Sequence, residues 1–168
     1  MKKVKIYFGA PLFSDSERYY NKLVVDTLRE KLGSDVDIYL PQENEAINDK
    51  SGFADSIAIA KADTEELVKS DLLIAIMDGQ TMDVGLASEI GVAYAQDIPI
   101  IGLYSDSRQG AFGNQKKIDA LEEVAESQFS YINLYTVGLV KLSGEIARTT
   151  DELIQLVIEK VEDFKSGE

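Results

Sequence analysis

Glu89 is the one charged residue in a predicted helix that runs from Val84 to Gln96. Leu86 and Ala93 lie three residues before it and four after it, so the carboxylate shares a face with apolar side chains. Taking a charge out of water is costly unless it is paired, and groups with shifted pKa values gather at functional sites. Glu89 is therefore a candidate catalytic carboxylate. The alternatives are a backbone cap or an ion pair with a buried lysine.

A second carboxylate, Asp63, shows the same pattern. Ile59 and Leu67 lie four residues before and after it, which places Asp63 within an apolar stripe of its helix. That helix also carries other acids, so a solvated carboxylate is the alternative interpretation. Tyr7 ends a predicted strand and Asp83 directly precedes the helix of the first carboxylate, with packing and ordinary helix capping as their simpler explanations.

The composition excludes many other chemistries. The chain has 168 residues with no His and no Cys, which removes thiol nucleophiles, Ser-His arrangements and Cys/His zinc sites. A formal net charge of -13 repels nucleic acids and anionic membranes and favours a small-molecule partner. A magnesium site at Asp78, Asp83 and Glu89 is a disfavoured alternative, because such sites usually need closely convergent oxygens, and no glycines have phosphate-loop spacing. We expect neither a metal nor a cofactor.

Alternating hydrophobic patterns predict one domain over residues 1–168, built from strands and helices in turn. The strands are typically ended by Gly or Pro, and the helices begin at Ser, Thr or Asp caps. The predicted elements, in chain order, are a strand at 4–8, a helix from the Ser14-x-x-Glu17 capping box to Leu32, a strand at 36–40, a loop at 42–52, a helix at 53–69, a strand at 72–77, a helix at 84–96, a strand at 99–104, helices at 116–126 and 131–141, a strand at 145–148 and a final helix capped at 149–152.

This alternation predicts a doubly wound, three-layer α/β/α fold with about five parallel strands. The longest apolar run, Leu72 to Met77, is uninterrupted as in a strand covered on both faces, and it is too short to span a bilayer. We expect a cytoplasmic protein with no membrane partner. Ligands of such folds bind beyond the carboxyl ends of the strands, where residues 7–13, 41–44, 78–89 and 104–107 lie.

Several segments resemble the nucleoside 2-deoxyribosyltransferases in order and spacing. They are Tyr7-Phe8-Gly9-Ala10-Pro11-Leu12-Phe13, Ala62-Asp63, Ser70-Asp71-Leu72-Leu73, a block that runs from Asp83-Val84-Gly85 through Glu89 to Ala95, and Asn133-Leu134-Tyr135-Thr136-Val137-Gly138. The resemblance covers about residues 4 to 140. It implies a flavodoxin-like parallel sheet, which agrees with the fold expected from the hydrophobic pattern.

The resemblance also implies roles for the matching residues. Glu89 corresponds to the nucleophile that attacks the anomeric carbon, Tyr7 to the phenol that orients it, and Asp63 to the carboxyl that exchanges a proton with the base. A homo-oligomer is implied as well, because Asn133 corresponds to a residue that reaches the sugar from a neighbouring subunit. The implied substrate-binding residues are Asp83 and Asn133 for the sugar and Phe13, Gly9, Gln42 and Glu45 around the base and the nucleophile.

The implied activity is transfer of 2-deoxyribose between nucleobases through a covalent ester on Glu89, with a deoxynucleoside and a free nucleobase as partners. Two alternatives stay open: an N-glycosidase, in which water replaces the acceptor base, and a non-catalytic nucleoside-binding module. The family position for a base-contacting amide falls at Glu45, with Gln42 and Asn44 close by, so the sequence does not fix the base. A carboxylate at Asp83 repels a dianionic phosphate and favours nucleosides over nucleotides.

Overall fold

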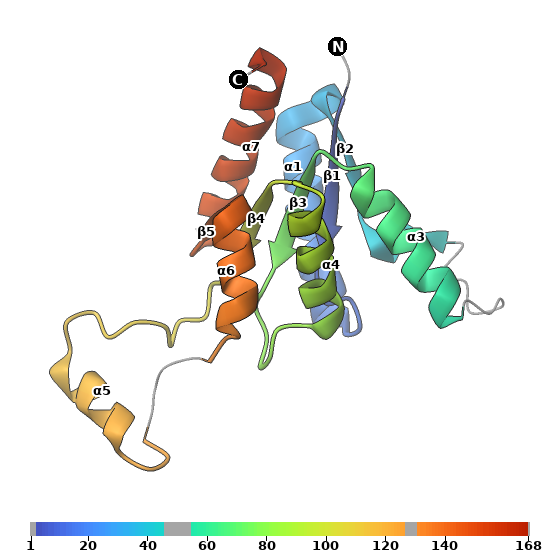
Figure 1. Ribbon diagram of the computed structural model, residues 1–168. Helices are drawn as coiled ribbons and strands as arrows, with labels where there is room; N and C mark the ends of the chain where they lie inside the picture. Colours follow the sequence, from blue (N-terminus) through green and yellow to red (C-terminus); the bar gives the residue numbers. More distant parts are fainter. Residues whose placement is uncertain (1–2, 46–54, 127–130, 168) are drawn as a thin grey trace.

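A computed structural model describes residues 3–45, 55–126 and 131–167 (Figure 1). Its centre is a parallel sheet of five strands in the order β2-β1-β3-β4-β5. This confirms the predicted flavodoxin-like, doubly wound fold. The strands are β1 (Val4–Gly9), β2 (Val36–Tyr39), β3 (Leu72–Ile76), β4 (Ile100–Leu103) and β5 (Gly144–Ala147).

Helices cover both faces of this sheet because its inner strands are apolar on both sides (Figure 1). One face packs against α1 (Asp15–Leu32) and α7 (Thr150–Ser166). The other packs against α3 (Ser56–Val68), α4 (Val84–Ala95) and α6 (Leu134–Ser143). Since side chains alternate along β1, Ile6 and Phe8 face the first layer while Tyr7 faces α4.

Side-chain caps fix where most helices begin. The predicted capping box at Ser14 is present: its hydroxyl accepts from the Glu17 N–H, and the Glu17 carboxylate accepts from the Ser14 N–H at 2.7 Å. Asp55 caps α3, which therefore starts at Ser56, later than predicted, while positions 53 and 54 lie outside the described residues. Short 3-10 turns follow α1 and β2, namely η1 (Gly33–Asp35) and η2 (Pro41–Glu43).

The predicted helix at 116–126 is wrong in its length. The chain forms only α5 (Gln115–Asp119) and the 3-10 turn η3 (Ala120–Glu122), and Ala125 adopts a positive φ of 66°. Ile118, Leu121 and Val124 remain exposed, so tertiary packing does not support a longer helix. This segment lies apart from the layered body (Figure 1).

Smaller shifts occur near the ends of other predicted elements. The helix expected at 131–141 is α6, which begins after its cap Asn133, and the strand expected at 145–148 is displaced by one residue. The loop expected at 42–52 starts within η2, and its residues 46–52 lie outside the described part. None of the described helices is both long and apolar enough to cross a membrane.

Candidate active site

Tyr7 and Glu89 meet between the sheet and α4. Tyr7 is fully buried near the carboxyl end of β1, and Glu89 lies in the second turn of α4, half-buried against the same face. The Tyr7 hydroxyl donates a hydrogen bond of 2.7 Å to Glu89 Oε1. A phenol that donates to a carboxylate restricts its rotation while leaving the second oxygen available to another partner.

Gly9, at the end of β1, makes room for that second oxygen. A Cβ atom at this position would lie 2.8 Å from Glu89 Oε2 and 2.8 Å from Leu86 Cδ1, closer than real contacts allow. The sequence singled out Gly9 for substrate binding, and the geometry gives it a steric reason: only a residue without a side chain lets the carboxylate approach the strand end.

Burial dominates the electrostatics of the pair. It raises the pKa of Glu89 to about 7, against the opposing effect of the Tyr7 hydrogen bond, and the charges of Asp63 and Asp83 raise it further. Burial, followed by the charge of Glu89, also raises the pKa of Tyr7. The phenol thus stays protonated as a donor, and Glu89 is a carboxylate poised to change its protonation near neutral pH.

Asp63 lies on α3, and its charge acts on Glu89. Burial raises the pKa of Asp63, and a hydrogen bond from Tyr39 acts in the opposite direction. The prediction that Asp63 lies in an apolar stripe is only half right, because Leu67 is buried while Ile59 is 40% exposed. The first turns of α3 extend beyond the sheet, so only its later residues reach the core (Figure 1). Asp63 lies at this boundary, half-buried and accessible to a proton acceptor.

Asp83 and Asn133 occupy helix N-termini. The Asp83 carboxylate accepts from the Leu86 N–H at 2.9 Å and caps α4, and its charge still influences Glu89. Asn133 caps α6 by accepting from the Thr136 N–H at 3.0 Å, and it is exposed. Asn133 and its neighbours line a groove between α4 and α6. Glu89, Tyr7 and Gly9 do not line this groove.

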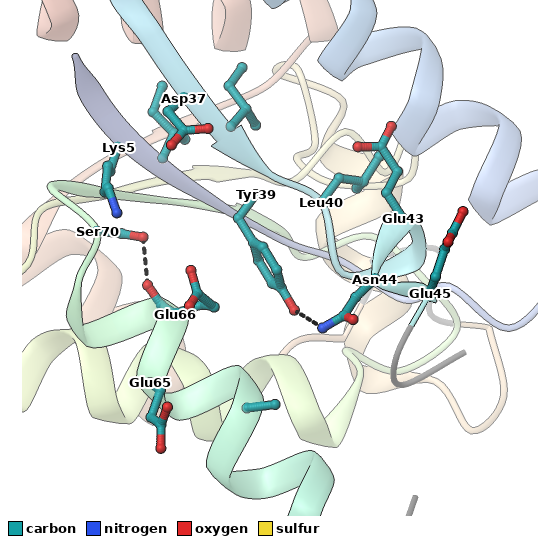
Figure 2. Close-up of a pocket in the computed structure, with 13 residues that line it drawn as sticks. Lys5, Asp37, Tyr39, Leu40, Glu43, Asn44, Glu45, Glu65, Glu66 and Ser70 are labelled. Carbon is teal, nitrogen blue, oxygen red and sulfur yellow. Dashed lines mark hydrogen bonds between the residues drawn. The ribbon is translucent and has the colours of Figure 1, made fainter. Parts of the chain in front are cut away.

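The other predicted binding residues lie around the loops after β1 and β2. Phe13 is 75% exposed. Gln42 is bound within the fold, because its oxygen accepts from Asn21 and its amide donates to the Arg18 carbonyl. Glu45 is exposed and lines a hollow between β2 and α3 (Figure 2). Among the described residues, no three acidic side chains gather closely enough to hold a metal ion.

Comparisons with known proteins identify the family of the chain. The profile of the nucleoside 2-deoxyribosyltransferase family matches residues 6–133, a span that includes all of the predicted site residues. The chain belongs to this family. No curated protein sequence matches it significantly.

Solved structures share the fold of this nucleoside 2-deoxyribosyltransferase family member. A conserved protein from Enterococcus faecalis V583 is 53% identical, with a TM-score of 0.89 over 95% of this chain and 99% of that one. The 2-desoxiribosyltransferase from Leishmania mexicana is 18% identical, with a TM-score of 0.62 over 95% and 97%. The 2-deoxyribosyltransferase from Bacillus psychrosaccharolyticus is 18% identical, with a TM-score of 0.60 over 94% and 96%.

Sequence reasoning missed one residue of the site in this family member, Tyr39. It ends β2 directly beside Tyr7 in the parallel register, and the two rings lie 5.3 Å apart between centroids. The Tyr39 oxygen accepts from Asn44 Nδ2 at 3.0 Å (Figure 2). The sequence carried part of the signal, since both tyrosines lie near the ends of predicted strands, but the strand order and register that bring them together come from the structure.

Proposed function

We propose that the chain transfers 2-deoxyribose between the bases of 2′-deoxynucleosides by double displacement, with Glu89 as the nucleophile. Membership of the family gives the reaction class. The observation that carries the assignment within the chain is the hydrogen bond from Tyr7 to Glu89, in a site where burial raises the carboxylate's pKa. A desolvated, oriented carboxylate is the group that an electron-deficient anomeric carbon requires.

In the first half-reaction, a Glu89 oxygen bonds to the anomeric carbon as the bond between that carbon and the base nitrogen breaks. The electron pair of that bond stays on the base nitrogen, and Asp63 gives its proton to the departing base. The products are a deoxyribosyl ester of Glu89, a neutral free base and the Asp63 carboxylate. Retaining glycosidases divide the work between two carboxyl groups in the same way.

In the second half-reaction, an acceptor base occupies the place of the first. Its ring nitrogen bonds to the anomeric carbon, the ester bond breaks, and the electron pair returns to the Glu89 carboxylate. The proton lost by the acceptor nitrogen goes to Asp63, which restores the starting state. Each displacement inverts the anomeric carbon, so the overall outcome is retention. The raised pKa of Asp63 suits a group that alternates between acid and base.

The remaining predicted residues have binding roles in this proposal. Asp83 and Asn133 bind hydroxyl groups of the sugar, while Phe13, Gln42 and Glu45 border the base. We expect 2′-deoxynucleosides to react faster than ribonucleosides, because a 2′-hydroxyl withdraws electrons from the cationic transition state and crowds the nucleophile. Comparable kcat/KM values for inosine and 2′-deoxyinosine would contradict this expectation.

The proposal includes a homo-oligomer in which Asn133 completes a neighbouring site. A groove between α4 and α6 supports it, because apolar side chains line the groove and several are exposed to solvent: Val84, Tyr94, Tyr131 and Tyr135. Exposed apolar surface of this kind marks interaction sites.

Leu134→Lys, beside the groove, should dissociate the oligomer and abolish turnover, whereas Leu23→Lys on α1 should change neither. A fully active monomer in sedimentation would overturn this part.

Incubation of 2′-deoxyinosine with adenine tests the activity. Transfer predicts 2′-deoxyadenosine and hypoxanthine in equal amounts. Free 2-deoxyribose as the main product would identify an N-glycosidase instead, and binding without turnover would identify a nucleoside-binding module.

A second experiment tests the nucleophile. Glu89→Gln keeps the side-chain volume but removes the charge, so turnover should fall by several orders of magnitude, as loss of a primary nucleophile costs about 10⁶-fold in a protease. Mass spectrometry of the wild-type chain quenched with substrate alone should find the deoxyribosyl group on the peptide that contains Glu89. A group on another carboxylate, or near-normal turnover by the Gln variant, would refute the assignment.

A further inference from the structure

Asn21 is a polar residue in the second turn of α1 that is almost completely buried, with 2% of its surface exposed. Its amide nitrogen donates two hydrogen bonds, one of 2.9 Å to the Pro11 carbonyl and one of 3.1 Å to Gln42 Oε1. Pro11 belongs to the loop between β1 and α1, and Gln42 belongs to η2, which follows β2. One side chain thus joins the loops that follow two neighbouring strands of the sheet.

The direction of these hydrogen bonds is fixed by their end points. The carbonyl groups of Pro11 and Arg18 can only accept, so an amide nitrogen must face each of them. Gln42 Nε2 donates to the Arg18 carbonyl at 2.9 Å, which leaves Gln42 Oε1 to accept from Asn21. Both hydrogens of the Asn21 amide nitrogen are therefore used, and their directions set the position of the Pro11 carbonyl relative to Gln42.

Other side chains of α1 hold the same two loops at their outer ends. Glu17 Oε2 accepts from the Phe13 N–H at 3.0 Å. The Arg29 guanidinium donates to both carboxylate oxygens of Glu43, at 3.0 and 2.8 Å. These outer contacts are exposed to water and contribute little on their own, so the buried hydrogen bonds of Asn21 are the firmer link between the loops.

The two loops that Asn21 joins carry residues of the proposed base site. The loop after β1 contains Phe13, and η2 runs on into Asn44 and Glu45, which line the hollow between β2 and α3 (Figure 2). Because Asn21 is buried behind these loops, it acts on a bound base through them.

We propose that Asn21 is a positioning residue that holds the base-binding loops after β1 and β2 at a fixed separation, with Gln42 as its partner. This inference rests on the proposed function, which supplies the nucleobase as the ligand. The catalytic pair has a separate support, since β1 pairs with β3 as far as Gly9 and Tyr7 bonds directly to Glu89. Loss of Asn21 should therefore weaken binding of the base and leave the chemical step almost unchanged.

Asn21→Leu tests the proposal, because leucine keeps the branched shape of the side chain and removes the donor. KM for 2′-deoxyinosine and for adenine should each rise about 10-fold, roughly the contribution of one hydrogen bond, while kcat should change by less than about threefold. Unchanged KM values, with or without a lower kcat, would mean that Asn21 serves only the stability of the fold and would overturn the inference.

Val161→Ala is the matched control. Val161 is also buried, at 1% exposed, and belongs to the same core layer as α1. It lies on α7, which packs over β4 and β5, toward the opposite edge of the sheet from β2. This truncation should lower the free energy of unfolding and leave both KM values unchanged. If it raised KM as much as Asn21→Leu, the effect would follow from stability alone and the inference would fail.

Gln42→Met breaks the same link from the other side, at a half-buried position where folding should survive even if Asn21→Leu does not fold. It should also raise KM about 10-fold, and an unchanged KM would overturn the inference. In the double variant, KM should rise little beyond that of either single variant, because both substitutions remove one shared link. Increases that multiply would show that the two residues act independently, against the proposal.

Calorimetric titration of 2′-deoxyinosine measures the effect without turnover, in chains that also carry Glu89→Gln. The Kd should rise about 10-fold when Asn21→Leu is added and stay constant when Val161→Ala is added. An unchanged Kd in the Asn21→Leu chain overturns the inference and leaves the proposed function intact. Absence of any deoxyribosyl transfer by the wild-type chain would instead overturn the proposed function, and the titration would still decide whether Asn21 holds the binding loops.

Discussion

Tyr7 and Glu89 are 82 positions apart in the chain and are joined by a hydrogen bond of 2.7 Å. The bond links the carboxyl end of β1 to the second turn of α4, so the packing of α4 against the sheet sets the position of the carboxylate. It also offsets part of the cost of burying that carboxylate, because a donated hydrogen bond favours the charged form.

Tyr7→Phe should therefore raise the pKa of Glu89 above its present value of about 7. A hydrogen bond to a charged group contributes about 1.5 to 3 kcal/mol, which corresponds to roughly one to two pKa units. Transfer should slow by about 10-fold or more at pH 6 and recover toward high pH as Glu89 ionises. The pH profile of kcat/KM measures this shift, and an acid limb at the wild-type position would contradict it.

The fold could be predicted because its determinants are local. Each strand is a short apolar run, and side-chain caps such as Ser14 and Asp83 mark where helices begin. Glu89 could be found as well, since a single carboxylate in a helix that otherwise carries no charge is visible in the sequence. Its partner Tyr7 was implied only by the resemblance to the family, because a tyrosine near the end of a strand is by itself more often a packing residue.

Other features depend on packing that no local pattern contains. The prediction for the helix at 116–126 used its periodicity, but Leu121 and Val124 have no core to pack against and the helix ends early. The position of Tyr39 beside Tyr7 depends on the register between β1 and β2, which the sequence alone does not specify. Asn133 is placed by α6, but its proposed partner belongs to a second copy of the chain.

Gly9→Ala should disrupt the site more than the fold. The added methyl group would meet Glu89 Oε2 and Leu86 Cδ1 at 2.8 Å, and moving Leu86 or the backbone is costly because both are buried. Turnover should fall by about 10²-fold, the scale of loss when catalytic groups are misplaced by about 1 Å. Gly138→Ala in α6 is the control: its Cβ meets no atom within 4 Å, so stability should rise slightly and turnover should persist. Equal behaviour of the two variants would disprove this explanation of Gly9.

Substitutions of Asp83 should separate its capping of α4 from the effect of its charge on the pKa of Glu89. Asp83→Asn retains an N-cap acceptor for the Leu86 N–H, whereas Asp83→Ala removes it and should cost about 1 kcal/mol of unfolding free energy. Both variants remove a negative charge that raises the pKa of Glu89, so the acid limb of kcat/KM should move to lower pH in both. Urea unfolding and pH profiles measure the two effects. If the acid limb of kcat/KM moved only in Asp83→Ala, the shift would come from loss of the α4 cap and not from loss of the negative charge.

Glu89→Gln should make the fold more stable at alkaline pH while it abolishes transfer. Burial raises the pKa of Glu89 from its usual 4.5 to about 7, so the folded chain binds this proton more tightly than the unfolded chain. The stabilisation that this proton provides is complete below pH 4.5 and is lost as the pH rises through about 7. Glutamine does not titrate and keeps its acceptor for the Tyr7 hydroxyl.

Relative to wild type, Glu89→Gln should therefore gain about 1 to 3 kcal/mol in unfolding free energy between pH 5 and pH 8. Urea unfolding of both proteins at these two pH values and one protein concentration gives the difference directly. Glu162→Gln removes an exposed carboxylate from α7, so it should change stability by less than about 0.5 kcal/mol at either pH. If Glu89→Gln has no larger effect than this control, then Glu89 is not held as a buried, costly charge, and the physical basis of its proposed reactivity fails.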